Sequence, residues 1–172
     1  MSNDPTSLIV SRFLQQSAVV GAYDSLSWPC FYGFMPDDES VPDSLVCVYD
    51  IEGSTKGKLM RNNVVIDYPM VSIMVRATSY ADGFRKASGI KDAMDAYRNE
   101  YLELDGGSAY SIADAKRNGN VNAIGQATGT RRRYLFSINY ALTLASADDL
   151  SSVVEGVDAL HVLVHTDIAD AF

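Results

Sequence analysis

Three consecutive arginines, Arg131, Arg132 and Arg133, form the clearest group in this sequence that could bind an anion. Guanidinium groups bind phosphate and carboxylate oxygens through paired hydrogen bonds. The run opens a stretch of alternating apolar and polar residues, so Arg131 and Arg133 are expected on one face of a strand and Arg132 on the other. This pattern fits a contact with a partner's anionic groups or a solvated strand terminus, and neither interpretation requires catalysis.

Two histidines, His161 and His165, lie four residues apart, a spacing that on a helix would place both imidazoles over one metal ion. A zinc site would need two further ligands, and the pair lies in an apolar, strand-like run near the C-terminus. We therefore predict no metal site and interpret these residues as surface or interface histidines.

The glycines of "GQATGTRRR" (residues 125–133) have a spacing that superficially resembles a phosphate-binding loop. That loop needs Lys and then Ser or Thr after its second glycine, and a helix must follow it. Here a strand follows, so the helix N-terminus that would bind phosphate is missing. We predict no nucleotide or other cofactor.

Nothing in the sequence assembles a catalytic group. Cys30 and Cys47 have no neighbouring histidine or acidic residue, and no serine lies in a G-x-S-x-G turn. The carboxylates of "PDDES" (residues 36–40) lie in a loop where nothing is expected to desolvate them and shift their pKa. We predict that the protein is not an enzyme.

Length and composition indicate one folded unit. The 172 residues are 47% hydrophobic, enough for one core. A net charge of −8 disfavours a protein that wraps nucleic acid, although it is compatible with DNA sliding past without binding. Two cysteines are too few for a disulfide framework, and neither a secretory signal nor a membrane-spanning stretch is seen. Synthesis in a reducing cytosol is expected.

The N-terminal half predicts one helix followed by strands. Residues 6–20 carry an apolar helical stripe, and residues 30–34 and 44–51 are expected to be short strands joined by an exposed, proline-rich acidic loop. The polar segment 52–63 is long for a hairpin and cationic within an acidic protein. We predict that it is a protruding arm or loop that contacts a neighbouring subunit or a partner.

The second half predicts the main packing unit. Residues 69–78 alternate as a strand, and residues 80–101 then carry apolar side chains at three- and four-residue steps, as a helix does. Residues 108–116 read as a strand, with "RNGN" (117–120) as a turn and 121–129 as a second loop. Six apolar residues in strict alternation within 133–145 give the strongest strand signal in the sequence.

These elements predict an α+β fold: a mostly antiparallel, twisted sheet with helices packed on one face, plus a C-terminal extension. We place the domain at residues 1–145. The acidic extension, 146–172, is expected to dock on the domain or on a neighbouring subunit. The opposite sheet face is expected to be polar, neutral to basic in charge, and to carry Met70 and Met74.

The order of elements resembles that of the tail terminator (tail completion) proteins of tailed bacteriophages, a group also called minor capsid proteins. The resemblance covers about residues 8–145. It is carried by "YPMVSIMVRATSY" leading into "ADGFRKASGIKDAMDAYRN", and by a glycine and arginines opening "RRYLFSINYALTL". The residues that match are Val75, Arg76, Ala77, Gly129, Arg131, Arg132, Arg133 and Asn139.

This resemblance implies a structural virion protein that forms a ring, typically of six copies, on the head-proximal end of the tail tube. Such a ring ends tube polymerisation and joins the tail to the head connector or neck. Its implied partners are further copies of itself, the tail tube protein and the connector, while DNA passes through the channel without specific binding. Residues assigned to the subunit or partner interface are Lys56, Lys58, Arg61, Arg76, Arg131, Arg132, Arg133 and Asn139.

Two alternatives remain open at the level of sequence. The chain could be a neck or head-closure protein, which differs from a terminator in its partner. It could also be a small anion-binding α/β protein or enzyme that grips a ligand with Arg76 and the arginines of 131–133 on the exposed sheet face.

Overall fold

The computed structural model describes residues 4–58, 65–96, 100–104, 109–127 and 132–146. Two helices and six strands make up this part of the chain. In order they are α1 (Thr6–Gln16), β1 (Cys30–Tyr32), β2 (Leu45–Lys58), β3 (Val65–Ala77), α2 (Tyr80–Ala96), β4 (Glu100–Glu103), β5 (Ala109–Ala127) and β6 (Arg133–Ser146). Neither helix is long and apolar enough to cross a membrane.

The strands form one sheet in the order β1-β2-β3-β6-β5-β4. Neighbouring strands are antiparallel except β1 and β2, which run parallel. The α+β class is therefore confirmed, and the sheet is mixed rather than purely antiparallel. The parallel pair arises because residues 33–44 carry the chain back to the end of the sheet from which β1 started, instead of closing a hairpin.

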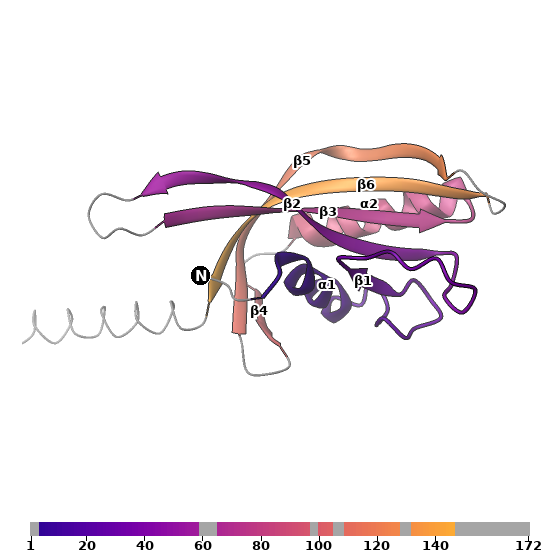
Figure 1. The fold of residues 1–172 in the computed structure, drawn as a ribbon, viewed down its shortest axis with the longest axis horizontal. Helices are drawn as coiled ribbons and strands as arrows, with labels where there is room; N and C mark the ends of the chain where they lie inside the picture. Colours follow the sequence, from indigo (N-terminus) through magenta and orange to yellow (C-terminus); the bar gives the residue numbers. More distant parts are fainter. Residues whose placement is uncertain (1–3, 59–64, 97–99, 105–108, 128–131, 147–172) are drawn as a thin grey trace, which may run out of the picture.

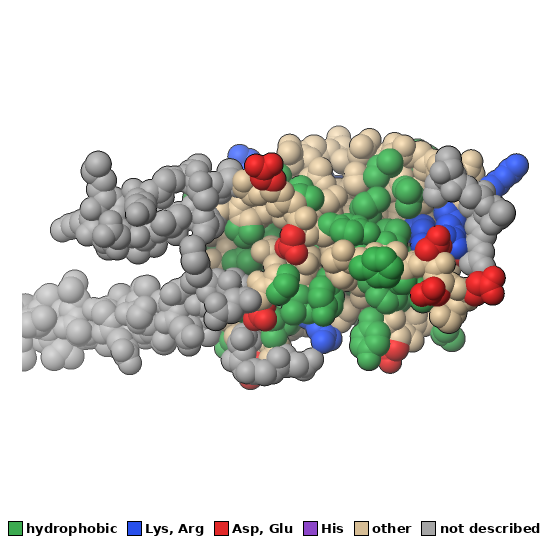
Figure 2. All heavy atoms as spheres, viewed as in Figure 1, with side chains coloured by type: hydrophobic (Ala, Val, Ile, Leu, Met, Phe, Trp, Pro, Cys, Tyr) green, Lys and Arg blue, Asp and Glu red, His purple; other side chains and the backbone are tan. Residues whose placement is uncertain are grey.

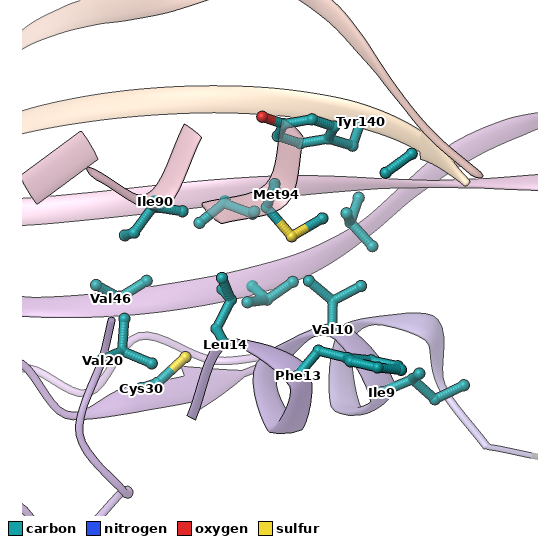
Figure 3. Packing of buried hydrophobic residues seen from close by; sticks show 14 of the residues in the cluster. Ile9, Val10, Phe13, Leu14, Val20, Cys30, Val46, Ile90, Met94 and Tyr140 are labelled. Carbon is teal, nitrogen blue, oxygen red and sulfur yellow. The ribbon is translucent and has the colours of Figure 1, made fainter. Parts of the chain in front are cut away.

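One face of the sheet, which we call the inner face, contributes to the same buried core as both helices. Val46, Ile73, Phe136 and Tyr140 are among its fully buried members. Alternation explains this set, since residues two apart on a strand point to the same side. The helices add their apolar stripes, which include Ile9, Val10, Phe13, Leu14, Ile90 and Met94. Figure 3 shows Val10 and Leu14 of α1 pointing toward Met94 of α2.

The arm predicted at 52–63 is present as a two-stranded extension. Strands β2 and β3 run past the predicted limits of 44–51 and 69–78 and continue to Lys58 and from Val65. Figure 1 shows them extending beyond the other elements. The ladder along the arm is irregular, because register shifts occur between Ile51 and Ser54 and again between Thr55 and Lys58.

The predicted end of the second helix is wrong. Helix α2 ends at Ala96, and the chain then forms β4. Tyr101, which continued the helical spacing, is 55% exposed, whereas Leu102 and Leu104 are buried. Alternate burial is the period of a strand, so the agreement of Tyr101 with the helical stripe was coincidental.

The turn predicted at "RNGN" and the loop predicted at 121–129 are also wrong for the described residues. Both belong to β5, which pairs with β6 from Tyr110 to Ala127. The pairing register shifts between Asn118 and Asn122 and again between Ala123 and Gly125. Gly119 and Gly125 have φ angles of 88° and 127°, values that side chains disfavour. The glycines therefore allow bulges within one strand instead of a reversal of the chain.

Both cysteines are buried, and this predicts a loss of stability in alkali. Burial raises the pKa of the Cys30 thiol to about 12 and that of the Cys47 thiol to about 11, from an ordinary value of 9.0. The folded state thus holds both thiols neutral at a pH where the unfolded chain ionises them. Stability is fully present below pH 9.0 and falls as the pH rises toward 12.

The test is the midpoint of thermal unfolding as a function of pH. It should be constant from about pH 7 to 8.5 and should fall from about pH 9. Burial also raises the pKa of Tyr49 and Tyr140, so the slope above pH 10 has several sources. A variant with Cys30→Ala and Cys47→Ala should lose the slope between pH 9 and 10. An unchanged slope there would contradict the assignment.

Candidate interaction surface

The face of the sheet opposite the core, which we call the outer face, is formed by the alternate residues of β2, β3 and β6. The pairing register shows which of these residues are neighbours across strands. Met74 lies between Cys47 and Ser137, and Tyr49 is paired with Ser72. The sequence predicts a face with polar residues and methionines, and the register agrees. The outer-face residues that are half-buried or exposed include Tyr49, Ile51, Met70, Ser72, Met74, Leu135, Ser137, Asn139, Ala141 and Thr143.

Arg76 lies at one end of the outer face and holds the loop 33–44, which we call the acidic loop. Its side chain is 4% exposed. Nε donates to the carbonyl of Asp43 at 3.0 Å, and Nη1 donates to the carbonyl of Pro36 at 2.9 Å. Weaker contacts join Nη1 to Asp37 Oδ1 at 3.5 Å and Nη2 to the Pro42 carbonyl at 3.4 Å. Arg76 therefore binds both ends of the acidic loop.

Arg133 completes this arrangement from β6. Its side chain is 9% exposed, its Nη2 lies 2.6 Å from Asp43 Oδ1, and its Nη1 donates to Asp37 Oδ1. Asp37 thus contacts both arginines. Two buried cations on neighbouring strands are paired with two carboxylates of one loop, and charge-assisted bonds of this kind are stronger than neutral ones.

The acidic loop therefore differs from the exposed connection that its composition predicts. Pro36 is buried, and Leu45 and Cys47, on the part of the outer face next to the loop, are fully buried. Asp37 itself stays 70% exposed and Asp43 34% exposed, so water still reaches both carboxylates. Sequence reasoning missed this pairing, although two signals were visible: two prolines that enclose acidic residues, and two arginines expected on the same face of the sheet.

The other interface residues predicted from the sequence are distributed unevenly. Arg132 is exposed and directly precedes β6. Asn139 is half-buried in the middle of the outer face, and its side-chain oxygen is buried without a hydrogen-bond partner in the described structure. The side chains of Lys56 and Lys58, and all of Arg61 and Arg131, lie outside the described residues, as do His161 and His165. The interface assignment of the eight residues stays a prediction.

The two edges of the sheet differ in the length of strand that they leave without a neighbour in the described chain. On one side, β1 has three residues and pairs with β2. On the other, β4 pairs only with residues 109–112 of β5, so residues 114–127 have no strand on their outer edge within the described chain. This long β5 edge carries the two bulges. Unpaired backbone groups on a strand edge are able to bond to a strand from another chain.

Two grooves lie beside the helices. One, of 590 Å³, separates α2 from residues 18–28. There Lys86 donates to the carbonyl of Val19 at 2.8 Å and lies 5.0 Å from the centre of the Trp28 ring, while Asp82 and Arg85 pair with each other at 3.0 Å. Lys86 therefore already joins α2 to the chain at Val19 and Trp28, and Asp82 and Arg85 are paired within α2.

The second groove, of 360 Å³, lies between α1 and β1 and is lined in part by Tyr23, Tyr32 and Phe34. These three side chains are 66%, 50% and 69% exposed, so this end of the sheet presents aromatic surface. Figure 2 shows hydrophobic side chains gathered toward the middle of the viewed face, with charged ones toward its margins. Among the described residues no group of three or more His, Cys, Asp or Glu side chains is placed to hold a metal ion.

Comparisons with known proteins give a family match and several similar solved structures. The sequence model of a family described as bacteriophage tail terminator protein matches residues 14–145. Among solved structures, a chain from the virion of a native gene transfer agent particle is similar over 79% of this chain and 92% of its own, with 13% identity and a TM-score of 0.44. A second solved chain is 14% identical over 81% of this chain and 97% of its own, with a TM-score of 0.39. No curated protein matches significantly.

Proposed function

Since this chain belongs to the bacteriophage tail terminator protein family and is thus a structural protein of the phage tail, we propose that it forms a six-membered ring capping the tail tube. The ring binds the head-proximal end of the tube, ends tube polymerisation and joins the tail to the head connector. The protein resides in the virion and is made in the cytoplasm of the host bacterium. The family match over residues 14–145 is the observation that carries this proposal.

The shape of the subunit supports closure into a ring. A ring of identical copies needs two different, complementary patches on each subunit, joined by a constant rotation. Within the described residues the long β5 edge has no neighbouring strand, whereas the opposite side has the short β1 strand with exposed Tyr32 and Phe34. These sides differ in length and in polarity, as the two halves of a head-to-tail contact do.

The charges suit a passage for DNA. The chain carries a net charge of −8, so the walls of a channel formed by such subunits repel phosphate more than they attract it. DNA then moves through the ring without specific contacts, and partners are recognised by shape.

The anion-binding alternative is not favoured by the described residues. It requires Arg76 and Arg133 to grip a ligand on the outer face, but both guanidinium groups already bind Asp37 and the chain around Asp43. A ligand would have to displace the acidic loop before it could bind there.

The test is to add the purified protein to tail tubes during their polymerisation and to measure tube length and end decoration by electron microscopy. Increasing protein should shorten the tubes and place one ring on one end, and native mass spectrometry should give six copies per ring. A protein that stays monomeric at high concentration and leaves tube length unchanged would overturn the proposal. Rings that bind only the connector would identify a head-closure protein instead.

The β2–β3 arm gives a more specific prediction. In an arm-shortened variant, residues 53–68 are replaced by Asn-Gly, a sequence suited to the two-residue turn that would then join Glu52 to Pro69. We expect loss of ring formation or of tube capping, because the arm extends beyond the core and is free to reach a neighbour. Unfolding should remain cooperative, since no core residue is removed. An arm-shortened protein that assembles normally would contradict an interface role for the arm.

A further inference from the structure

Polar contacts, rather than apolar packing, hold the acidic loop against the sheet. Of residues 33–44, all of which the structure describes, Pro36 alone is buried, and residues 37–40 are exposed. None of them belongs to the buried hydrophobic core. A segment with few buried apolar contacts opens locally at a lower free-energy cost than the core beside it. The acidic loop is therefore able to open while the rest of the fold stays closed.

Two arginines supply the charged contacts that close the loop. Arg76 donates to the carbonyls of Pro36 at 2.9 Å and Asp43 at 3.0 Å. Arg133 contacts the carboxylates of Asp37 and Asp43. Asp37 is 70% exposed and Asp43 34% exposed, so dissolved ions reach both carboxylates. Because salt screens charge pairs that are open to solvent, the closed position should weaken as the ionic strength rises.

The closed position also leaves one buried donor unpaired. The Nε atom of Arg133 is buried and has no hydrogen-bond partner in the described structure. A buried donor without an acceptor is unfavourable, and water that enters when the loop opens is able to hydrate it. This unfavourable feature of the closed form brings the open form nearer to it in free energy.

One of the two cysteines lies under the start of the loop. Hydrogen bonds join Cys47 to the backbone of Phe34, and Tyr49 to the backbone of Met35. Cys47 is paired with Met74 on the outer face, yet Cys47 is fully buried whereas Met74 is half-buried. The contact with the backbone of Phe34 accounts for this difference. The loop therefore shields the Cys47 thiol from solvent.

Both ends of the loop are fixed by strand pairing. At the first end, Gly33 donates to the carbonyl of Val48 at 2.8 Å and has a φ of 69°. At the other end, Leu45 begins β2 and is paired with Arg76 of β3. Opening thus needs rotation only near Gly33 and Ser44, and the sheet keeps its hydrogen bonds.

We propose that the acidic loop is a salt-sensitive latch that moves off the outer face as a unit while the sheet stays folded. The open form exposes Leu45 and Cys47 and releases the guanidinium groups of Arg76 and Arg133 for contact with a partner. Ionic strength sets the balance between the two forms, and the latch controls access to this end of the outer face. It belongs to the single subunit and does not depend on ring formation.

The experiment uses the full-length protein with Cys30→Ala, which leaves Cys47 as its single thiol. Alkylation by iodoacetamide, an uncharged reagent, is followed by mass spectrometry at about pH 8, in about 0.02 M and about 0.5 M sodium chloride. The matched control is the reciprocal variant Cys47→Ala. Its remaining thiol, Cys30, belongs to the core on the inner side of the sheet.

We expect the higher salt concentration to speed the alkylation of Cys47 by about threefold or more and to leave that of Cys30 unchanged. Adding Arg133→Ala to the Cys30→Ala protein should speed alkylation of Cys47 on the order of tenfold at low salt and remove most of the salt effect, because the ion pairs are already lost. Adding Ile90→Val instead weakens the core and lowers the midpoint of thermal unfolding, but should not change the rate at Cys47.

Either of two results would show that the loop is not a latch. The first is a Cys47 rate that responds neither to salt nor to Arg133→Ala. The second is a rate that rises in Arg133→Ala and Ile90→Val in proportion to their loss of stability, since the thiol would then be reached by global unfolding. If Arg133→Ala does not fold, the salt comparison between Cys47 and Cys30 decides the question by itself.

Discussion

Replacing Gly83 by alanine should lower the free energy of unfolding by about 1 to 3 kcal/mol. Gly83 is buried on α2 at the point where the helix meets the sheet. A Cβ atom added there would lie 2.4 Å from Cε2 of Phe136 and 2.8 Å from Cβ of Ala77. Phe136 and Ala77 are fully buried, so relief requires a shift of the helix or of the Phe136 ring against its neighbours.

The matched control is Gly89→Ala in the same helix. Nothing lies within 4 Å of a Cβ at that position, and the residue is exposed. Alanine should there raise the free energy of unfolding by about 0.4 to 1 kcal/mol, since it restricts the unfolded chain and favours the helix. Urea unfolding of both variants measures the difference. If both substitutions stabilise the protein, α2 does not pack as closely on Phe136 as the structure indicates.

The second large effect is expected for Arg133→Ala. This substitution removes the contacts of the Asp37 and Asp43 carboxylates with Arg133 and opens space beside the outer face. Breaking a buried ion pair by removing one partner costs about 3 to 5 kcal/mol. Because Asp37 is largely exposed and regains water, we expect a loss of about 2 kcal/mol in the free energy of unfolding.

Arg132→Ala serves as the control for this prediction. Arg132 adjoins Arg133 in the sequence but is exposed, so its loss should change the free energy of unfolding by less than about 0.5 kcal/mol. Limited proteolysis gives a second readout, since the acidic loop should be cleaved faster in Arg133→Ala than in Arg132→Ala. Equal cleavage and equal stability of the two variants would mean that Arg133 does not hold the loop.

The sequence predicted those elements in which one periodicity held over many residues. The alternation of 133–145 and of 69–78 gave β6 and the core part of β3, because each carries a fully buried face. The wrong prediction at the end of α2 arose because the apolar residues of a short segment fitted both the helical and the strand period. Tyr101 continued the helical spacing of α2, yet Leu102 and Leu104 followed the strand period that the pairing of β4 with β5 imposes.

Bulges and long-range ion pairs explain the remaining differences. A turn at "RNGN" was expected because asparagine and glycine favour turns, but pairing with β6 kept the segment within β5. The contact of Arg133 with Asp37 joins residues 96 positions apart, and no local pattern specifies such a distance. Sequence patterns predicted Arg76 and Arg133 as interface residues. They did not show that both side chains bind Asp37 of the same chain.

The bulged edge of β5 has a consequence for solubility in a crowded host cell. A flat strand of this length with one free side would accept any extended peptide and could seed fibrils. The shifts at Asn118–Asn122 and Ala123–Gly125 break that side into short, differently oriented pieces. An unrelated extended peptide can therefore form only a few consecutive backbone hydrogen bonds with this edge. A neighbouring subunit whose strand has complementary bulges would form hydrogen bonds along the whole edge.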